Sequence, residues 1–462
     1  MSLRPALLFI SLWPVYSQRI VSRTQIEVKG YSIERVGLPR YPVWAGPGRF
    51  AYIEYWAQGK PQPGYYVECL DARYYSVWSY FIDIPARGRD YPLTLVGLKE
   101  AVVLLSYDED PLTPGVLQEV AQFLDHRGRP LLRKWTTFSA YDRQAAKAIR
   151  GLSLSPDSTH LLWYAYLPGK KKPIEQAWFA LWHQSGRKVV YANDWNVPAP
   201  ILAAFPDNRG KIWLLTQSPT ESPVLLYYDP TTRTFRSWRL TPDSLLHAPW
   251  LYVTPTSIYV GGLIQGPKNL PLEKGLAGRW AIGRLPLPLT DTTQITWSRA
   301  DIPWTDLYKE PTGFRAVRFL PHGDRALYIL WEDLRQKGEA YLAYDVWITR
   351  WESGDSLRLA WSYRIEKKQR ELRPEALSFY TGLSNDFLSV AFLTEHTGQG
   401  KLQVHQINHQ TGESLVKDLA ENRTGDLLVL PGRSVQLSGR EVITLALPAP
   451  GRNGYQIYHL EL

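Results

Sequence analysis

The chain has 462 residues, of which 44% are apolar and 13% aromatic, so it can bury a large core and is not an intrinsically disordered protein. Its formal net charge of +9 favours acidic partners through long-range attraction. No Lys/Arg stripe and no known nucleic-acid-binding module accompanies that charge, so we expect no nucleic-acid partner.

The first residues predict export. A short positive segment, Met1–Arg4, precedes the nine-residue apolar run Pro5–Trp13, and Ser17 offers a small residue before Gln18. A run this short cannot span a bilayer, which needs about 20 residues, and it is typical of a secretory signal. We predict a signal peptide at 1–17 and a mature domain at 18–462. A retained anchor or an apolar first strand is the alternative.

The expected location is therefore periplasmic, cell-surface or secreted. We expect the mature chain to be envelope-associated at most, without a transmembrane segment, and to act as a monomer or as part of a larger complex. Cys69 is the only cysteine, so no intrachain disulfide can form. It lies in step with Val67 in a strand-like run, where a buried small hydrophobic residue is expected.

The segment 149–195 serves as a template for the rest of the chain. It contains four short runs rich in aromatic and branched residues, separated by turn residues such as Pro156-Asp157-Ser158. Similar four-strand units recur along the chain. Their approximate ranges are 31–85, 91–140, 149–195, 200–240, 247–303, 313–366, 376–420 and 426–462.

The last unit lacks an outer strand. The strand-like segment after the signal, within 19–28, can pair beside 455–462 and close a ring without exposed edges. Spacings of about 50 to 65 residues match one four-stranded blade each. We predict an all-β fold, a β-propeller of eight four-stranded blades, with seven blades as the alternative.

Several turns are followed at a short distance by a tryptophan: Asp125–Gly128 by Trp135, Asp229–Thr232 by Trp238, and Glu352–Gly354 by Trp361. This pattern resembles the repeats of quinoprotein-type eight-bladed propellers, in which the indole docks neighbouring blades. The Ser155-Pro156-Asp157 turn resembles those of tricorn- and prolyl-oligopeptidase-type propellers. The quinoprotein cofactor and calcium ligands cannot be matched, so that activity is not implied and we expect no cofactor.

Connection lengths predict where a ligand binds. With the strands of a blade labelled A to D, the A–B and C–D turns are short, whereas the B–C and D–A connections are long. Strand geometry places both long classes at one end of the ring, and long connections on a rigid scaffold commonly carry binding. The expected loops are 57–64, 108–116, 168–176, 262–279, 303–313 and 366–375.

Candidate binding residues lie on or near these connections. The basic groups are Lys170, Lys171, Lys172, Lys367 and Lys368, which a solvated loop would equally explain. The aromatic candidates are Trp56, Trp304 and Trp331, which can stack on a sugar or hold a peptide. Five other tryptophans occupy D-strand positions, where packing between blades is expected: Trp78, Trp135, Trp238, Trp297 and Trp361.

Catalytic signals are weak, and we name no catalytic or metal-binding residue. The Gly354–Leu357 sequence matches a serine-hydrolase motif but falls on a C–D turn rather than on a strand-to-helix turn. His405 and His409 lie on a strand and its turn, which disfavours a metal pair. The adjacent carboxylates Asp108, Glu109 and Asp110 could hold a hard cation, but they lack the spaced ligands and glycine of a calcium loop, and a solvated acidic loop is favoured. An acid/base pair for glycoside cleavage among Asp301, Asp306 and Glu310 is an open alternative.

Two function classes follow. The first is an exported non-enzymatic scaffold or recognition module that binds a protein or an acidic or glycan polymer through the long connections. The second is a glycan hydrolase or lyase that uses the central funnel, for which two facing carboxylates are required.

Overall fold

The computed structural model of the protein describes residues 19–26, 40–56, 64–83, 91–109, 116–141, 149–168, 174–186, 188–192, 197, 200–217, 222–240, 246–265, 278–290, 293–302, 314–354, 356–371, 379–394, 400–422, 428–447 and 455–462. All regular elements among them are β-strands. A membrane-spanning helix is therefore not found in the described part of the chain. The predicted signal peptide at 1–17 lies outside it.

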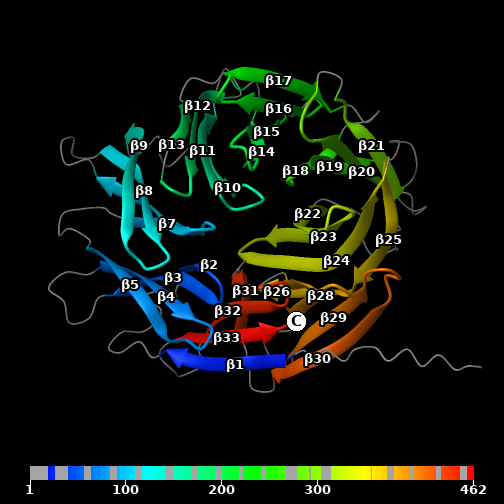
Figure 1. The fold of residues 1–462 in the computed structure, drawn as a ribbon. Helices are drawn as coiled ribbons and strands as arrows, with labels where there is room; N and C mark the ends of the chain where they lie inside the picture. The colour runs from blue at the N-terminus through cyan, green and yellow to red at the C-terminus, as the bar shows by residue number, and fades with distance from the viewer. Residues whose placement is uncertain are drawn as a thin grey trace, which may run out of the picture.

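Eight antiparallel sheets form a ring, and we number them as blades 1 to 8 in chain order (Figure 1). Strand A of each blade lies nearest the centre of the ring and strand D lies outermost. Blade 1 consists of β2 (Arg40–Trp44), β3 (Arg49–Trp56), β4 (Gly64–Asp71) and β5 (Ser76–Asp83), and blade 2 of β6 (Tyr91–Gly97), β7 (Ala101–Glu109), β8 (Val116–Asp125) and β9 (Pro130–Tyr141).

Blade 3 consists of β10 (Ile149–Leu154), β11 (His160–Pro168), β12 (Ile174–His183) and β13 (Lys188–Ala192). Blade 4 consists of β14 (Ile201–Pro206), β15 (Ile212–Thr216), β16 (Val224–Asp229) and β17 (Thr234–Arg239).

Blades 5 to 7 continue the pattern. Blade 5 consists of β18 (Leu246–Val253), β19 (Ser257–Gln265), β20 (Gly278–Pro286) and β21 (Thr296–Asp301). Blade 6 consists of β22 (Phe314–His322), β23 (Ala326–Lys337), β24 (Ala340–Ser353) and β25 (Leu357–Ile365). Blade 7 consists of β27 (Tyr380–Leu383), β28 (Phe387–Leu393), β29 (Gly400–Asn408) and β30 (Ser414–Asn422). The predicted all-β propeller is confirmed.

Blade 8 combines both ends of the described chain. Its strands A to C are β31 (Leu428–Gln436), β32 (Glu441–Leu447) and β33 (Tyr455–Glu461), and its outer strand is β1 (Arg19–Ile26). The β1 strand runs antiparallel to β33 with a register from Arg19↔Glu461 to Ile26↔Tyr455. The ring therefore closes on eight blades, as predicted, because the N-terminal strand supplies the outer position that the C-terminal repeat lacks.

The core is divided into eight apolar clusters, each shared by two neighbouring blades, including the pair 8 and 1. Alternation along a strand explains this division. Trp163 of β11 belongs to the cluster with blade 2, whereas its neighbour Tyr164 belongs to the cluster with blade 4. Cys69 is buried and free, as predicted, and burial raises the pKa of its thiol to about 12.

We call the end of the ring with the A–B and C–D turns the turn face, and the end with the B–C and D–A connections the loop face. Blade 6 departs from the predicted loop pattern. Its β23 and β24 strands extend and join directly at Gly338-Glu339, and this hairpin, 334–343, is the blade 6 arm. In Figure 1 the arm points toward the middle of the ring.

The prediction of a loop at 366–375 was wrong for part of that range, which forms a strand. A short strand, β26 (Gln369–Glu371), pairs with β24 of the arm, from Tyr341↔Glu371 to Ala343↔Gln369. The central parts of the other predicted loops lie outside the described residues.

Candidate functional site

Most of the predicted binding residues stay predictions. Lys170, Lys171, Lys172 and Trp304 lie outside the described residues, and Trp56 ends β3 without a described side chain. Lys368 is exposed on the loop face, between β25 and β26. It is the one predicted residue that the structure describes as accessible to a ligand.

Trp331 does not fit a surface role. Its side chain is fully buried in the cluster between blades 5 and 6, where its ring lies 6.1 Å from that of Trp280 and 6.2 Å from that of Trp250. Its indole N–H donates to Thr349 Oγ1 at 3.0 Å. The prediction was wrong because residue 331 lies on an inner strand that runs through the blade and not on a connection.

Lys367 is likewise buried, and its predicted role in an exposed basic loop is wrong. Its ammonium group forms an ion pair with the fully buried Glu332 and donates to Gln369 Oε1 at 2.9 Å. Gln369 Nε2 donates to the Leu393 carbonyl of blade 7 at 2.6 Å. Burial lowers the pKa of Lys367, and the negative charge of Glu332 opposes this effect. The segment after β25 is thus fixed between two blades.

A second charged pair lies beside the first. Arg364 Nε donates to Asp345 Oδ2 at 2.6 Å, and both side chains are largely buried. The Lys367 backbone N–H donates to the other oxygen of Asp345 at 3.3 Å. We call Glu332, Asp345, Arg364, Lys367 and Gln369 the strap cluster, because together they attach the segment 366–371 to the base of the blade 6 arm.

Sequence reasoning missed the strap cluster, because the strand alternation at 365–370 is visible only in the burial of these residues and not in their types. Residues 365–370 alternate between buried and exposed, beginning with buried Ile365, which is the period of a strand. The inward positions after Ile365 hold Lys and Gln, which a sequence pattern assigns to solvent. Burial of these residues depends on Glu332, a distant residue on β23.

The innermost strands carry basic residues. Arg315 and Arg318 lie on β22, the innermost strand of blade 6, and both are exposed. Burial of part of the Arg318 side chain lowers the pKa of its guanidinium, and the negative charge of Glu332 opposes this effect. The eight A strands, as the structure bounds them, contain no Asp or Glu. A glycosidase pair would have to come from the connections.

At the turn face, tryptophans link consecutive blades. The Trp78 indole N–H donates to the His126 carbonyl in the C–D turn of blade 2, at 3.0 Å, and Trp361 makes the same bond to His409 of blade 7 at 2.9 Å. Each turn contains a glycine with positive φ, Gly128 and Gly412, where an added Cβ would come within 2.7 and 2.9 Å of the indole. The predicted indole docking is confirmed at these two positions.

The other D-strand tryptophans fit the same prediction in part. Trp238 and Trp297 pack against the cluster between blades 4 and 5, as expected for contacts between blades. The side chain of Trp135 is not described.

Two histidines meet at the turn face between blades 6 and 7. The rings of His322 and His409 lie 4.2 Å apart, and His409 is almost fully buried. Its Nε2–H donates to the Ser384 carbonyl at 2.9 Å, and its Nδ1 accepts from the Tyr328 hydroxyl at 2.7 Å. Burial, with help from the charges of His322 and Arg350, lowers the pKa of His409 to about 4. His409 is therefore neutral at pH 7.

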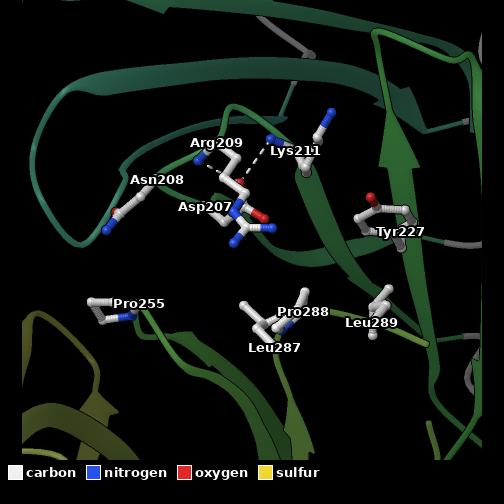
Figure 2. Close-up of a pocket in the computed structure, with 9 residues that line it drawn as sticks. All are labelled: Asp207, Asn208, Arg209, Lys211, Tyr227, Pro255, Leu287, Pro288 and Leu289. Atoms are coloured by element: carbon white, nitrogen blue, oxygen red, sulfur yellow. Dashed lines mark hydrogen bonds between the residues drawn. The ribbon is translucent and has the colours of Figure 1, made fainter.

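A cavity of about 100 Å³ opens at the turn face between blades 4 and 5 (Figure 2). The A–B turn of blade 4 forms one side of it, and β16 contributes Tyr227. Turns of blade 5 supply an apolar floor. The floor residues are Pro255, Leu287, Pro288 and Leu289. A smaller cavity of about 40 Å³ lies on the other side of Pro255, toward blade 6.

Three charged residues line the larger cavity, and two are already compensated. Asp207 Oδ1 accepts from the backbone N–H groups of Arg209 and Lys211, each at 2.9 Å, and Oδ2 accepts from the Trp213 indole at 3.4 Å. Lys211 forms an ion pair with Asp229 at 2.5 Å. The exposed Arg209 guanidinium makes no hydrogen bond or ion pair with a described residue, and in Figure 2 it points toward the floor. Its charge is available to a ligand.

The remaining sequence candidates do not assemble into a site. Asp301 forms an exposed ion pair with Arg279 at 2.6 Å. Asp110, Asp306 and Glu310 lie outside the described residues, and the side chains of Asp108 and Glu109 are not described. His405 and His409 lie on β29 and in the turn after it, as predicted. Within the described ranges, no three His, Cys, Asp or Glu side chains converge on one point.

No family model matches the chain, and no curated protein matches it by sequence. Solved structures match its fold. The β-propeller domain of the trilobed protease from Pyrococcus furiosus is 10% identical over 80% of this chain and 93% of that domain, with a TM-score of 0.38. A polysaccharide lyase, Uly1, is 10% identical over 82% of this chain and 90% of its own, with a TM-score of 0.38.

A prolyl endopeptidase structure also matches, at 10% identity, over 90% of this chain and with a TM-score of 0.41. This chain spans about half, 54%, of that protein's length. At these identities and TM-scores, the matches carry no argument about what this chain does.

Proposed function

We propose that the chain is an exported, non-enzymatic recognition module that binds a protein or an acidic polymer through its loop face. The observation that carries the proposal is the asymmetry of the ring. Strands β14 and β15 are joined at the turn face by 207–211, whereas β19 and β20 are separated at the loop face by 266–277, and β21 and β22 by 302–313. Long connections on a rigid frame favour binding at that face.

Two features of the described residues support a rigid, electropositive loop face. The strap cluster fixes the base of the blade 6 arm, so the arm can meet a partner with little loss of conformational freedom. Arg315 and Arg318 place exposed guanidinium groups on the innermost strand of the same blade. The first feature favours binding by a preformed surface, and the second favours a partner with negative charge.

The binding experiment compares two variants with equal loss of positive charge. One replaces Lys170, Lys171 and Lys172 by alanine. The other replaces exposed turn-face residues by alanine, namely Lys99, Arg127 and Arg325. Poly-glutamate serves as an acidic probe and dextran as a neutral one, and association rates are measured by surface plasmon resonance at two salt concentrations.

We expect the loop-face variant to bind poly-glutamate more slowly, with a weaker dependence on salt, because exposed charges act by screened steering. The turn-face variant should behave as the wild type. Equal effects of the two variants, or a loss confined to the turn-face variant, would place binding elsewhere.

Export is tested separately by N-terminal sequencing of the protein from its own host. Cleavage of the signal predicts a mature chain that begins at or near Gln18. Recovery of the folded, envelope-located protein with Met1 intact would refute this part of the proposal.

A further inference from the structure

We infer that the turn-face cavity between blades 4 and 5 binds an aliphatic residue that bears a free carboxylate, such as the C-terminal residue of a partner polypeptide. This inference is independent of the loop-face proposal, because it concerns the opposite end of the ring. It depends on the size of the cavity, on its floor, and on one unpaired charge at its rim.

The size of the cavity limits the ligand. At about 100 Å³ it is well below the roughly 300 to 1,000 Å³ of sites for drug-sized molecules and cofactors. It has room for one side chain or for a few waters, each of which occupies about 30 Å³ in the liquid. The natural occupant is therefore a single residue, which is how a partner protein anchors into a pocket.

The floor selects for an apolar body. Leu287, Pro288 and Leu289 lie side by side below the Arg209 guanidinium, and Pro255 closes one end (Figure 2). Tyr227 forms a side wall, and its ring packs on Trp213 at 4.8 Å. Burial raises the pKa of the Tyr227 hydroxyl, so the wall is neutral at physiological pH. An aliphatic side chain is the group that this surface would best remove from water.

Arg209 selects for a carboxylate. The other charged groups of the lining are held by partners within blade 4, whereas the Arg209 guanidinium has no hydrogen bond or ion pair with the part of the chain that the structure describes. A guanidinium presents paired N–H donors that match the two oxygens of a carboxylate. An Asp or Glu side chain would supply the carboxylate without an apolar body, so a C-terminal aliphatic residue fits both features.

The same face already holds one aliphatic residue in a comparable manner. Arg440, in the A–B turn of blade 8, donates through Nε to the main-chain oxygen of Leu462 at 3.2 Å. The Leu462 side chain is buried between blades 7 and 8. An A–B turn arginine can thus bind a main-chain oxygen while the adjoining side chain enters the space between two blades.

The test uses the full chain and N-acetyl-leucine as the probe, with its amide as the uncharged match, in ligand-observed NMR titrations. A fragment of this size should bind saturably with a Kd on the order of 1 mM. The amide should bind at least about tenfold more weakly, because it lacks the charged acceptor. Isocaproate, which has the carboxylate and the aliphatic chain but no peptide group, should bind more weakly than N-acetyl-leucine.

Three variants locate the site. Arg209→Gln should remove the preference for the acid over the amide, and Leu289→Asn should weaken both probes alike. Arg127→Gln, an exposed arginine on the same face of blade 2, is the matched control and should bind as the wild type does.

Several outcomes would overturn the inference. These are equal binding of acid and amide, unchanged affinity in Arg209→Gln, and absence of saturable binding in the wild type. Isocaproate binding as tightly as N-acetyl-leucine would overturn the assignment to a polypeptide terminus.

Discussion

The two faces of the ring join neighbouring blades by different means. At the turn face, the contacts are neutral hydrogen bonds. The indoles of Trp78 and Trp361 donate to carbonyls in turns of the next blade, and the Tyr328 hydroxyl of blade 6 donates to His409 Nδ1 of blade 7. At the loop face between blades 6 and 7, a buried ion pair, Lys367 with Glu332, joins the strap to the blade. Removing one partner of a neutral hydrogen bond lowers the free energy of unfolding only modestly. Removing one partner of the buried ion pair lowers it more, because an uncompensated buried charge remains.

This difference suggests a division of tasks. Indole–carbonyl hydrogen bonds recur at the turn face between blades 1 and 2 and between blades 6 and 7, where the Arg350 guanidinium also donates to the His409 carbonyl. A buried ion pair requires several matched groups, and here it is found where the blade 6 arm needs support. The strap cluster therefore holds the position of the blade 6 arm more firmly than a single hydrogen bond would, which suits the binding proposed for the loop face.

The largest effect on stability is expected from β1, the outer strand of blade 8, which closes the ring. Deleting residues 18–29 removes β1 and its seven residue pairings with β33, which leaves the apolar blade 8 with an open edge. With about one hydrogen bond for each pairing, and about 1 kcal/mol net for each bond, the loss in the free energy of unfolding is roughly 7 kcal/mol. Differential scanning calorimetry should show a lower Tm, and light scattering should show aggregation. An unchanged melting curve would mean that packing between blades closes the ring without β1.

The next effect tests the loop-face ion pair. Lys367→Met leaves Glu332 buried without its cation, so we expect a loss of about 4 kcal/mol in the free energy of unfolding, measured by urea titration. The double variant Lys367→Met/Glu332→Leu should recover most of this loss, because it removes both charges.

The neighbouring Lys368→Met is the control, since Lys368 is exposed, and it should change stability by less than about 0.5 kcal/mol. Equal effects at 367 and 368 would show that the buried pair does not brace the strap.

The same contrast explains what the sequence could predict. Blade number, ring closure by the N-terminal strand and the docked indoles follow from local signals, namely strand periodicity and turn residues such as Gly128. The strap cluster and the buried Trp331 depend on which distant strands become neighbours. The cavity beside Arg209 depends on the spacing of two blades, and the sequence of its turn, Asp207–Lys211, indicates a turn and no more.

The stability of the protein should depend on pH through His409 at the turn face. Its pKa is about 4 in the folded protein against about 6.5 for an ordinary histidine. Between these values the unfolded chain binds a proton that the folded chain does not, so stability falls as pH decreases from 6.5 to about 4. The contribution of this group is about 3 kcal/mol, present in full above pH 6.5.

The measurement compares urea midpoints of the wild type and His409→Gln at pH 7 and pH 4. Protonation brings a buried cation beside His322 and Arg350, and the Ser384 carbonyl and Asp386 offset this cost only in part. The variant should therefore lose less stability than the wild type over this range. A parallel loss in both proteins would assign the acid sensitivity to other groups.

The smallest effect distinguishes a docked indole from one that only packs. Trp78→Phe keeps an aromatic ring against Gly128 but removes the N–H that donates to the His126 carbonyl, so we expect a loss of about 1 kcal/mol beyond that of packing. Trp297 is the matched comparison, because its indole makes no hydrogen bond with a described residue although it packs between blades 4 and 5. Trp297→Phe should lose only the packing contribution. If urea titration gives equal losses for the two variants, the bond from Trp78 to the His126 carbonyl adds nothing to stability, and apolar packing accounts for the contribution of Trp78 to the junction of blades 1 and 2.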